Sequence, residues 1–388
     1  MPQIYDAIIL GAGASGLFCA AEAISRGKKV AVLEHNDRPL RKIAVSGGGK
    51  CNFTNLAADW KHYLSDNPKF TVSALSRFPP QQLLDLVAGN NIRIYQKTPG
   101  RYFCTDGAQK FMQMLLAQIS ETAIFYNTVF KEISRQQNLF HILTSRGEFT
   151  AQSLVIATGG ASYPNLGATS DGLMLAKQFG HKIIPARPAL VPFNLTPQQM
   201  EPLRNLQGIS LPAAVSINNQ TFTDDLLFTH FGLSGPAILQ ASLYWVKNQT
   251  LTINLLPQTN LFNFLKNNQN GTKCNISTIL KKLFPERVVS WLLNGEDFRL
   301  AEAGNKKIQA LADRINRWQV VPSSTAGYRL AEVMAGGIDT TEISSSTMES
   351  KIVSGLYFCG EVLDITGQLG GYNIQWAYSS GTAAGKNL

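Results

Sequence analysis

The chain has 388 residues, 44% of them hydrophobic, which is enough for two or three domains, and no apolar run approaches the length of a membrane-spanning helix. Its five cysteines form no Cys-x-x-Cys pair and its five histidines have no metal-ligand spacing, which argues against a disulfide framework or a metal site and favours reduced thiols. The formal net charge of +9 favours a polyanionic partner, or serves solubility alone.

The first predicted elements form a β-α-β unit over residues 5–34, with a short apolar strand, a helix and a second strand ending at Glu34. The turn before the helix reads Gly11-x-Gly13-x-x-Gly16. In this motif the first glycine permits a tight turn, the second lets a phosphate approach, and the third lets helix and strand pack closely. Because Glu34 stands where an acid binds ribose hydroxyls, the pattern predicts a dinucleotide site rather than an ordinary glycine-rich turn.

A second glycine-rich segment, residues 38–52, follows as a predicted loop. Arg41 and Lys42 would neutralise phosphate, and the glycines at 47–49 would present bare N–H groups to an anion. The alternative is a flexible surface loop. The loop ends near Cys51, for which packing against a cofactor is an alternative to catalysis.

Farther along, Asp106-x-x-Gln109 has the spacing of a capping box before an apolar helix, which predicts a structural role for Asp106. Cys104, two residues earlier, is either a packed thiol or a reactive one. Two more buried strands are predicted to end at Gly159 and Gly360, and a final helix beginning near Asn373 closes the chain.

The sequence pattern changes between about 187 and 256, where short β-type runs separated by polar turns indicate a barrel or small sheet domain. Within it, Ser234 is the predicted N-cap of a helix with Pro236 in its first turn. His230, just upstream, is a proton donor, a substrate contact or a hydrogen-bonded structural histidine.

Residues 257–317 have helical periodicity, and positive charge is concentrated there. The window 257–320 holds five acids and ten bases, a net +5, and the bases are Lys266, Lys273, Lys281, Lys282, Arg287, Arg299, Lys306, Lys307, Arg314 and Arg317. This excess predicts contact with a polyanion, against the alternative of a solvated helical face.

Seven segments together resemble one family of bacterial flavoproteins, which includes a ribosomal RNA dihydrouridine synthase, a bile-acid-reducing flavoprotein and an aminoacetone oxidase. They extend over essentially the whole chain and read GAGASGLFCA, RKIAVSGGGKCNFTN, LVIATGGASYPNLGATSDG, LVPF, LLFTHFGLSGPAIL, GYRLAEVMAGGIDT and TMESKIVSGLYFCGEVLDITGQLGGYNIQWAYSSG. The likeness is greatest to the synthase branch, because Phe103-Cys104 stands where other members have Phe-Pro.

The resemblance implies an α/β fold in three parts. A Rossmann-like FAD-binding domain of the glutathione-reductase type would comprise residues 1–187 and 336–388. It would be interrupted by a β-barrel-like domain, residues 188–256 and 318–335, which carries a basic helical insert at 257–317.

The implied cofactor is FAD, with NADH or NADPH as a transient reductant, since the sequence has no second strand-GxGxxG-helix unit. Glu361 or Asp364 would hold the ribityl chain, and the dipole of the last helix would stabilise negative charge on the reduced flavin. The residues expected to bind FAD are Gly11, Gly13, Ala14, Ser15, Gly16, Glu34, His35, Arg41, Lys42, Ser46, Gly47, Gly48, Gly49, Cys51, Asn52, Val129, Ala157, Thr158, Gly159, Gly160, Gly360, Glu361, Asp364, Gly370, Gly371, Tyr372, Asn373 and Ile374.

The implied reaction is reduction of a uridine C5=C6 bond in 23S rRNA to dihydrouridine in the cytoplasm, with hydride from flavin N5 to C6 and protonation of C5. The candidate acids are Cys104, Cys51 and His230, in that order. Large-subunit rRNA or a precursor would contact the basic insert. The alternatives are a small-molecule flavoenzyme, either an amine oxidase or an enone reductase, and a non-enzymatic FAD protein that binds ribosome precursors.

Overall fold

The computed structural model describes residues 3–98, 100–119, 123–269 and 274–388, so Lys273 of the basic segment lies outside the described residues. The chain divides into two units. The first comprises residues 1–188 and 332–388, and the second comprises residues 189–331. The second unit is therefore inserted into the chain of the first.

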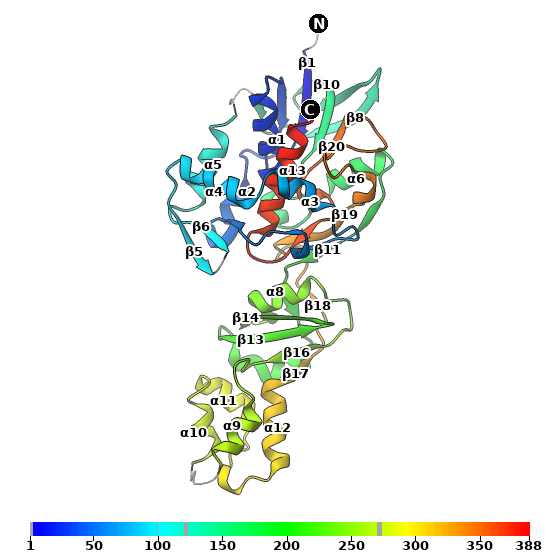
Figure 1. Cartoon of the computed structure of the whole chain (residues 1–388). Helices are drawn as coiled ribbons and strands as arrows, with labels where there is room; N and C mark the ends of the chain where they lie inside the picture. Colours follow the sequence, from blue (N-terminus) through cyan, green and yellow to red (C-terminus); the bar gives the residue numbers. More distant parts are fainter. Residues whose placement is uncertain (1–2, 99, 120–122, 270–273) are drawn as a thin grey trace. The chain divides into compact units, whose positions relative to one another are not determined.

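A seven-stranded sheet forms the centre of the first unit, in the order β7-β2-β1-β10-β9-β8 with β20 also paired to β10 (Figure 1). The strands are β1 (Ile4–Leu10), β2 (Val30–Leu33), β7 (Ile124–Phe125), β8 (Phe130–Gln136), β9 (Leu139–Thr144), β10 (Gly147–Ile156) and β20 (Leu356–Phe358). The pairings among β7, β2, β1, β10 and β20 are parallel, as the buried apolar runs of β1 and β2 lead one to expect. The predicted strands before Gly159 and Gly360 are confirmed as β10 and β20.

Two helices, α1 (Ala14–Ser25) and α13 (Tyr372–Gly385), lie against each other although they come from opposite ends of the chain (Figure 1). Glycine makes this approach possible. A Cβ on Gly381 would lie 2.3 Å from the Ser15 carbonyl oxygen, and one on Gly385 would lie 2.5 Å from that of Cys19. The predicted closing helix is thus confirmed, and it begins at Tyr372, beside the expected Asn373.

Between β2 and β7 the described residues form a three-stranded antiparallel sheet, β3-β6-β5, and the α-helices α2 to α5. The elements are α2 (Arg41–Val45), the 3-10 turn Ser46–Gly49, β3 (Asn52–Asn55), α3 (Thr71–Arg77), α4 (Pro80–Gly89), β5 (Ile94–Thr98), β6 (Arg101–Cys104) and α5 (Ala108–Leu116). β4 (Tyr63–Leu64) instead pairs with β21 (Thr366–Gly367) from the other end of the chain.

Asp106 has a structural role, but it is not the predicted helix cap. The N-cap of α5 is Gly107, which makes no side-chain cap. Asp106 forms ion pairs with Arg93 and Lys110 instead, and the Arg93 hydrogen bond, followed by that of Lys110, lowers its pKa to about 2. Arg93 and Lys110 bind the Asp106 carboxylate, which in a capping box would instead accept from a backbone N–H of the helix.

The first unit also contains α6 (Asp171–Gln178), the paired strands β11 (Ile183–Ala189) and β19 (Val333–Ile338), and the 3-10 helices Trp60–His62, Pro164–Leu166, Thr340–Glu342 and Gly360–Val362. β11 leads into the second unit, and β19 follows the return of the chain.

The second unit contains a seven-stranded antiparallel sheet in the order β17-β16-β13-β14-β15-β12-β18. The strands are β12 (Phe193–Asn194), β13 (Ser210–Ile217), β14 (Gln220–Phe228), β15 (Gly232–Ser234), β16 (Leu251–Asn254), β17 (Trp318–Val320) and β18 (Ser324–Thr325). Two short helical segments, α7 (Pro197–Met200) and the 3-10 helix Glu201–Leu206, connect β12 to β13. Helix α8 (Pro236–Ser242) has Pro236 in its first turn as predicted, but its N-cap is Gly235, because Ser234 is the last residue of β15.

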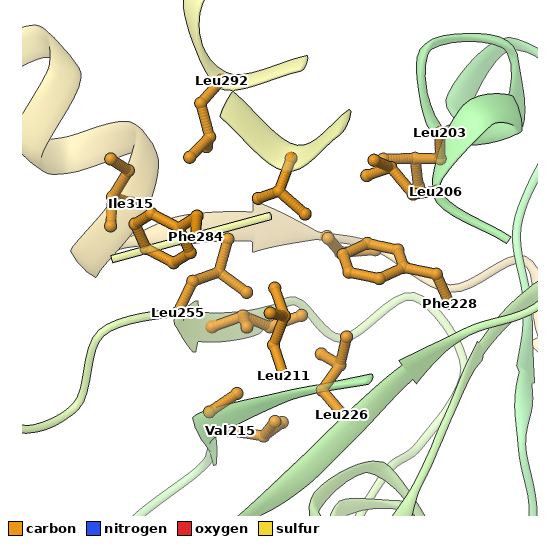
Figure 2. Close-up of a cluster of buried hydrophobic side chains, with 14 of the residues drawn as sticks. Leu203, Leu206, Leu211, Val215, Leu226, Phe228, Leu255, Phe284, Leu292 and Ile315 are labelled. Carbon is orange, nitrogen blue, oxygen red and sulfur yellow. The ribbon is translucent and has the colours of Figure 1, made fainter. Parts of the chain in front are cut away.

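Among the described residues after β16 lie the α-helices α9 (Leu261–Asn267), α10 (Ile276–Leu280), α11 (Glu286–Leu293) and α12 (Asn305–Asn316) and the 3-10 helix Leu300–Glu302. They share one hydrophobic core with the strands of this unit. Figure 2 shows Phe284, Leu292 and Ile315 from the helical segment facing Leu211 and Leu226 from the sheet. The basic helical segment is therefore anchored to the sheet by apolar contacts.

Candidate dinucleotide site

The turn between β1 and α1 has three glycines with different surroundings. A Cβ on Gly11, whose φ is +105°, would come within 2.6 Å of the Ala157 carbonyl oxygen, and one on Gly16 would come within 2.0 Å of the Gly11 carbonyl oxygen. A Cβ on Gly13 would meet no atom within 4 Å. Gly11 and Gly16 are thus required by packing, whereas Gly13 faces open space at the helix start, and this space is where a pyrophosphate approaches the backbone in such folds.

The N-terminus of α1 makes no side-chain cap, since its N-cap is Gly13. Ala14 and Ser15 occupy the first two helical positions, so their N–H groups carry the positive end of the helix dipole. The turn therefore offers both unsatisfied donors and open space to an anion.

Glu34 follows β2 and is only 5% exposed. The Ala12 N–H donates to its Oε2 at 2.8 Å, which ties the carboxylate to the glycine turn. Its Oε1 accepts from the Asn36 N–H at 2.8 Å and lies 3.3 Å from His35 Nδ1. Val129 is exposed beside this strand end, since the N–H of the preceding Thr128 donates to the Glu34 carbonyl. The predicted ribose-binding acid is in register with the turn.

The second glycine loop lies against the first. The Leu40 N–H donates to the Ala12 carbonyl oxygen at 3.0 Å, which joins the segment before α2 to the first glycine turn. Gly47 and Gly48 have left-handed φ values of 58° and 66°, and a Cβ on Gly48 or Gly49 would meet open space. Ser46 closes the loop, since its carbonyl oxygen accepts from the Cys51 N–H at 3.0 Å.

Lys42 and Arg41 both have protein partners in this structure. The Lys42 ammonium lies 2.5 Å from Glu361 Oε2 and donates to Ser162 Oγ at 2.6 Å. Arg41 donates to Asn36 Oδ1 at 2.6 Å. The charge predicted to neutralise phosphate is thus partly balanced by Glu361, and Arg41 has a neutral partner.

The two acids considered for the ribityl chain have different surroundings. Glu361 Oε1 accepts from the Met334 N–H at 2.8 Å and from Ser162 Oγ at 3.0 Å, so both carboxylate oxygens have protein donors. Asp364 is buried and accepts from the Asp66 N–H at 3.1 Å, and burial raises its pKa. Both Glu361 oxygens thus have protein partners, and Glu361 fixes the position of the Lys42 ammonium.

Segments from the end of the chain meet these loops. A Cβ on Gly360 would lie 2.5 Å from Ser15 Oγ, and one on Gly371, the N-cap of α13, would lie 2.6 Å from the Thr54 carbonyl oxygen. Gly370 accepts through its carbonyl from the Asn55 amide at 3.0 Å. Tyr372, Asn373 and Ile374 form the first turn of α13, which has no side-chain cap, so a second helix N-terminus keeps its donors uncapped.

The ends of β1 and β10 also meet at this edge. The Ala157 N–H donates to the Leu10 carbonyl oxygen at 3.0 Å. Thr158 follows, Gly159 has a φ of +74° with open space where its Cβ would be, and a Cβ on Gly160 would lie 3.0 Å from Glu361 Oε1. Ligands of open parallel sheets bind beyond the carboxyl ends of the strands, and the predicted residues gather there.

Of the three candidate acids, two lie together. Cys51 and Cys104 are both 0% exposed, and a hydrogen bond to Cys104, together with burial, raises the pKa of the Cys51 thiol well above its ordinary value. They lie together because Asn52 in β3 pairs with Phe103 in β6. His230 belongs to the second unit, where it is exposed in a cavity of about 440 Å³ that Arg204 and Phe231 also line.

Sequence reasoning missed Ser162, Met334 and Asn55, whose hydrogen bonds hold the predicted residues in place. No local pattern marks them, because their partners lie at least 27 residues away. Within the described part of the chain, no cluster of three metal-ligating side chains is found. No helix there is long and apolar enough to cross a membrane.

Known proteins are similar to this chain over nearly its whole length. The chain is 42% identical over 391 residues to the ribosomal RNA dihydrouridine synthase of Escherichia coli (strain K12), covering 99% of this chain and 98% of that protein. It is 29% identical over 403 residues to the 3-dehydro-bile acid delta(4,6)-reductase of Clostridium scindens, covering 97% of each.

The solved Mycobacterium smegmatis Sdh1 complex in the apo form has a similar fold, with a TM-score of 0.50 and 16% identity, covering 100% of this chain and 68% of that one. The family described as HI0933-like protein Rossmann domain matches residues 5–387. With its Rossmann-like sheet and glycine turn in place, the chain belongs to this HI0933-like family.

Proposed function

We propose that this protein is an FAD-dependent oxidoreductase that reduces a uridine C5=C6 bond in 23S rRNA to dihydrouridine, with NADH or NADPH as reductant. The observation that carries the proposal is the 42% identity, over nearly the full length of both chains, to a protein named ribosomal RNA dihydrouridine synthase. An rRNA substrate also places the reaction in the cytoplasm.

The residues present fit FAD. The open space at Gly13 and the uncapped N-terminus of α1 would receive the pyrophosphate, and Glu34 would bind the adenosine ribose. The uncapped first turn of α13 would stabilise negative charge on the flavin ring. Bound reduced FAD would supply the two electrons that saturate the C5=C6 bond.

The chain must also supply a proton to C5 of the base, and that acid has to touch the substrate. Cys51 and Cys104 are fully buried, whereas His230 is exposed in its cavity. His230 is therefore accessible to a substrate, whereas the two thiols are better suited to packing behind the loop that contacts the cofactor.

The basic helical segment supports an RNA partner. Lys281 and Arg299 form exposed ion pairs with Glu286 and Glu302. Lys282 and Lys306 are exposed and form no ion pair with the described residues. Positive charge of this kind binds phosphates with strong salt dependence.

The proposal is tested with purified protein, FAD and naked 23S rRNA. We expect dihydrouridine, measured by nucleoside mass spectrometry, to form with NADH or NADPH and to require both flavin and reductant. If flavin is reduced under these conditions and no dihydrouridine forms on naked rRNA or on a precursor particle, the proposal is wrong.

A second candidate function is reduction of a conjugated small-molecule enone. It is favoured by the 29% identity to a protein named 3-dehydro-bile acid delta(4,6)-reductase. Rapid oxidation of NADH or NADPH with a free enone steroid, in the absence of RNA, would support it over the rRNA substrate.

A further inference from the structure

The second unit contains a small cavity that is separate from the one beside His230. It has a volume of about 220 Å³. Trp291 from α11, Arg314 from α12, and Trp318 and Gln319 from β17 line it, so the basic helical segment and the sheet both contribute. Leu203 and Gln199 also line it.

The two tryptophans are held at nearly a right angle. Their ring centroids are 5.1 Å apart and the ring planes are inclined by 72°. Trp318 also stacks on Phe228, which is 1% exposed, at 6.1 Å and 24°. Since both indoles are only partly buried, the cavity has two fixed aromatic walls, one able to stack on a flat ring and the other able to contact its edge.

Four polar groups of this cavity lack protein partners within the described residues, whereas the amide of Gln199, which also lines it, donates to the Val321 carbonyl and accepts from the Thr196 N–H. Trp291 Nε1, Trp318 Nε1, the Arg314 guanidinium and the Gln319 amide form no hydrogen bond or ion pair there. The other core tryptophans differ, since Trp245 Nε1 donates to the Gln249 carbonyl and Trp376 Nε1 donates to the Gly360 carbonyl, both at 3.1 Å. The cavity therefore presents donors that remain available for a ligand.

These features specify the chemistry of the ligand. Two aromatic walls call for a flat ring, and the N–H donors call for acceptor oxygens or nitrogens on its edge. The volume is below the roughly 300–1,000 Å³ of pockets for drug-sized molecules, which suits a single base. Arg314 and the neighbouring exposed Arg317 add positive charge for a phosphate.

We propose that Trp291, Trp318, Arg314 and Gln319 bind one unstacked base of a single-stranded stretch of RNA. The inference rests on the proposed function for the identity of the nucleic acid. Proteins that bind single strands commonly combine a positively charged surface with aromatic platforms of this kind. The site would hold a nucleotide near the target uridine or farther along the same RNA.

The test measures binding of a short oligouridylate to the FAD-loaded protein over a range of salt concentrations. We expect Trp318→Leu to weaken binding by about 5- to 150-fold, the loss of one stacked base. The loss should be similar at every salt concentration, and Trp318→Phe should restore part of the affinity. Lys282→Ala should instead lower the slope of log affinity against log salt concentration by about one, because it removes a phosphate contact.

Two controls keep the result interpretable. Trp60→Leu, which removes a partly exposed tryptophan from the first unit, should leave binding unchanged. Arg314→Gln tests the cavity independently if the tryptophan variants misfold, since it keeps both aromatic rings. It should also weaken binding. An RNA backbone of equal length without bases should bind the wild type and Trp318→Leu equally.

The inference is overturned if folded Trp318→Leu and Arg314→Gln bind oligouridylate as tightly as the wild type. That result would leave the proposed function intact as long as the wild type still forms dihydrouridine on rRNA. Conversely, base-dependent binding through the tryptophans in a protein that forms no dihydrouridine would support the site and reject the proposed reaction.

Discussion

The Lys42 ammonium contacts Glu361 Oε2 at 2.5 Å, although 319 residues separate the two in the sequence. This ion pair joins the second glycine loop to the segment after β20, and Ser162 bridges the same two side chains. The contact is partly shielded, since the Glu361 side chain is 17% exposed. It locks together two parts of the predicted FAD site.

Glu361→Gln should lower the free energy of unfolding by about 1–3 kcal/mol, because it leaves the Lys42 ammonium without its counter-charge. FAD should also be retained less well. Urea unfolding and the flavin absorbance of purified protein measure the two effects. Lys42→Met/Glu361→Gln should lose less stability than the sum of the single variants.

Lys281→Ala is the matched control, since it breaks the exposed Lys281–Glu286 pair and should leave stability unchanged within error. Additive losses in the Lys42 and Glu361 double variant would show that this ion pair does not couple the two segments.

The glycines of the first turn should respond differently to alanine. Gly16→Ala should cost about 1–3 kcal/mol of stability, because its Cβ would overlap the Gly11 carbonyl. Gly13→Ala should keep the wild-type melting temperature of the FAD-free protein but bind FAD more weakly, because its methyl group would occupy the open space proposed for the pyrophosphate. Thermal unfolding and FAD titration separate the effects, and undiminished FAD affinity in Gly13→Ala would contradict the proposed pyrophosphate position.

Variants of the candidate acids show which one protonates C5. Replacing that acid should reduce the rate of dihydrouridine formation by about 100- to 10,000-fold, the usual contribution of a general acid, so His230→Gln is compared with Cys104→Ala. Cys104→Ala should retain flavin and most of that rate, since the thiol is fully buried. Single-turnover measurements on both variants decide the matter, and loss of the chemical step in a folded, FAD-loaded Cys104→Ala would restore the thiol as the donor.

His181, Ser350 and Glu342 in the first unit resemble the triad of a hydrolase, but their role is structural. His181 Nε2 lies 2.9 Å from Ser350 Oγ, and Nδ1 lies 3.2 Å from Glu342 Oε2. Ser350 is only 6% exposed, and its Oγ accepts from the N–H groups of Ile352 and Val353 at 3.0 and 2.9 Å. The hydroxyl therefore organises a turn and is closed to substrate.

Burial lowers the pKa of His181 below its ordinary 6.5, although Glu342 opposes this shift. The folded protein then binds fewer protons than the unfolded chain as the pH falls below 6.5. Stability should decrease with falling pH from there down through the folded-state pKa, and this dependence should be weaker in His181→Gln. Melting temperatures between roughly pH 5 and 7 test this, and identical slopes in both proteins would contradict it.

Local patterns could predict the β-α-β unit, because Gly16 and Glu34 act through contacts within that unit, with the Gly11 carbonyl and the Ala12 N–H. They could not predict that Lys42 pairs with Glu361 or that Cys51 meets Cys104, since each contact joins segments that are distant in the sequence. Capping rules failed at Asp106 for a related reason, because Arg93 binds its carboxylate. The aromatic cavity at Trp291 and Trp318 likewise joins elements that are separate in sequence.

The most direct test of the central claim is dihydrouridine mapping of 23S rRNA by mass spectrometry in a strain that lacks this gene. We expect one dihydrouridine to disappear on deletion and to return to its full level with the wild-type gene. With the Gly13→Ala gene its level should stay below that of the wild type. Full retention of rRNA dihydrouridine in the deletion strain would contradict the account.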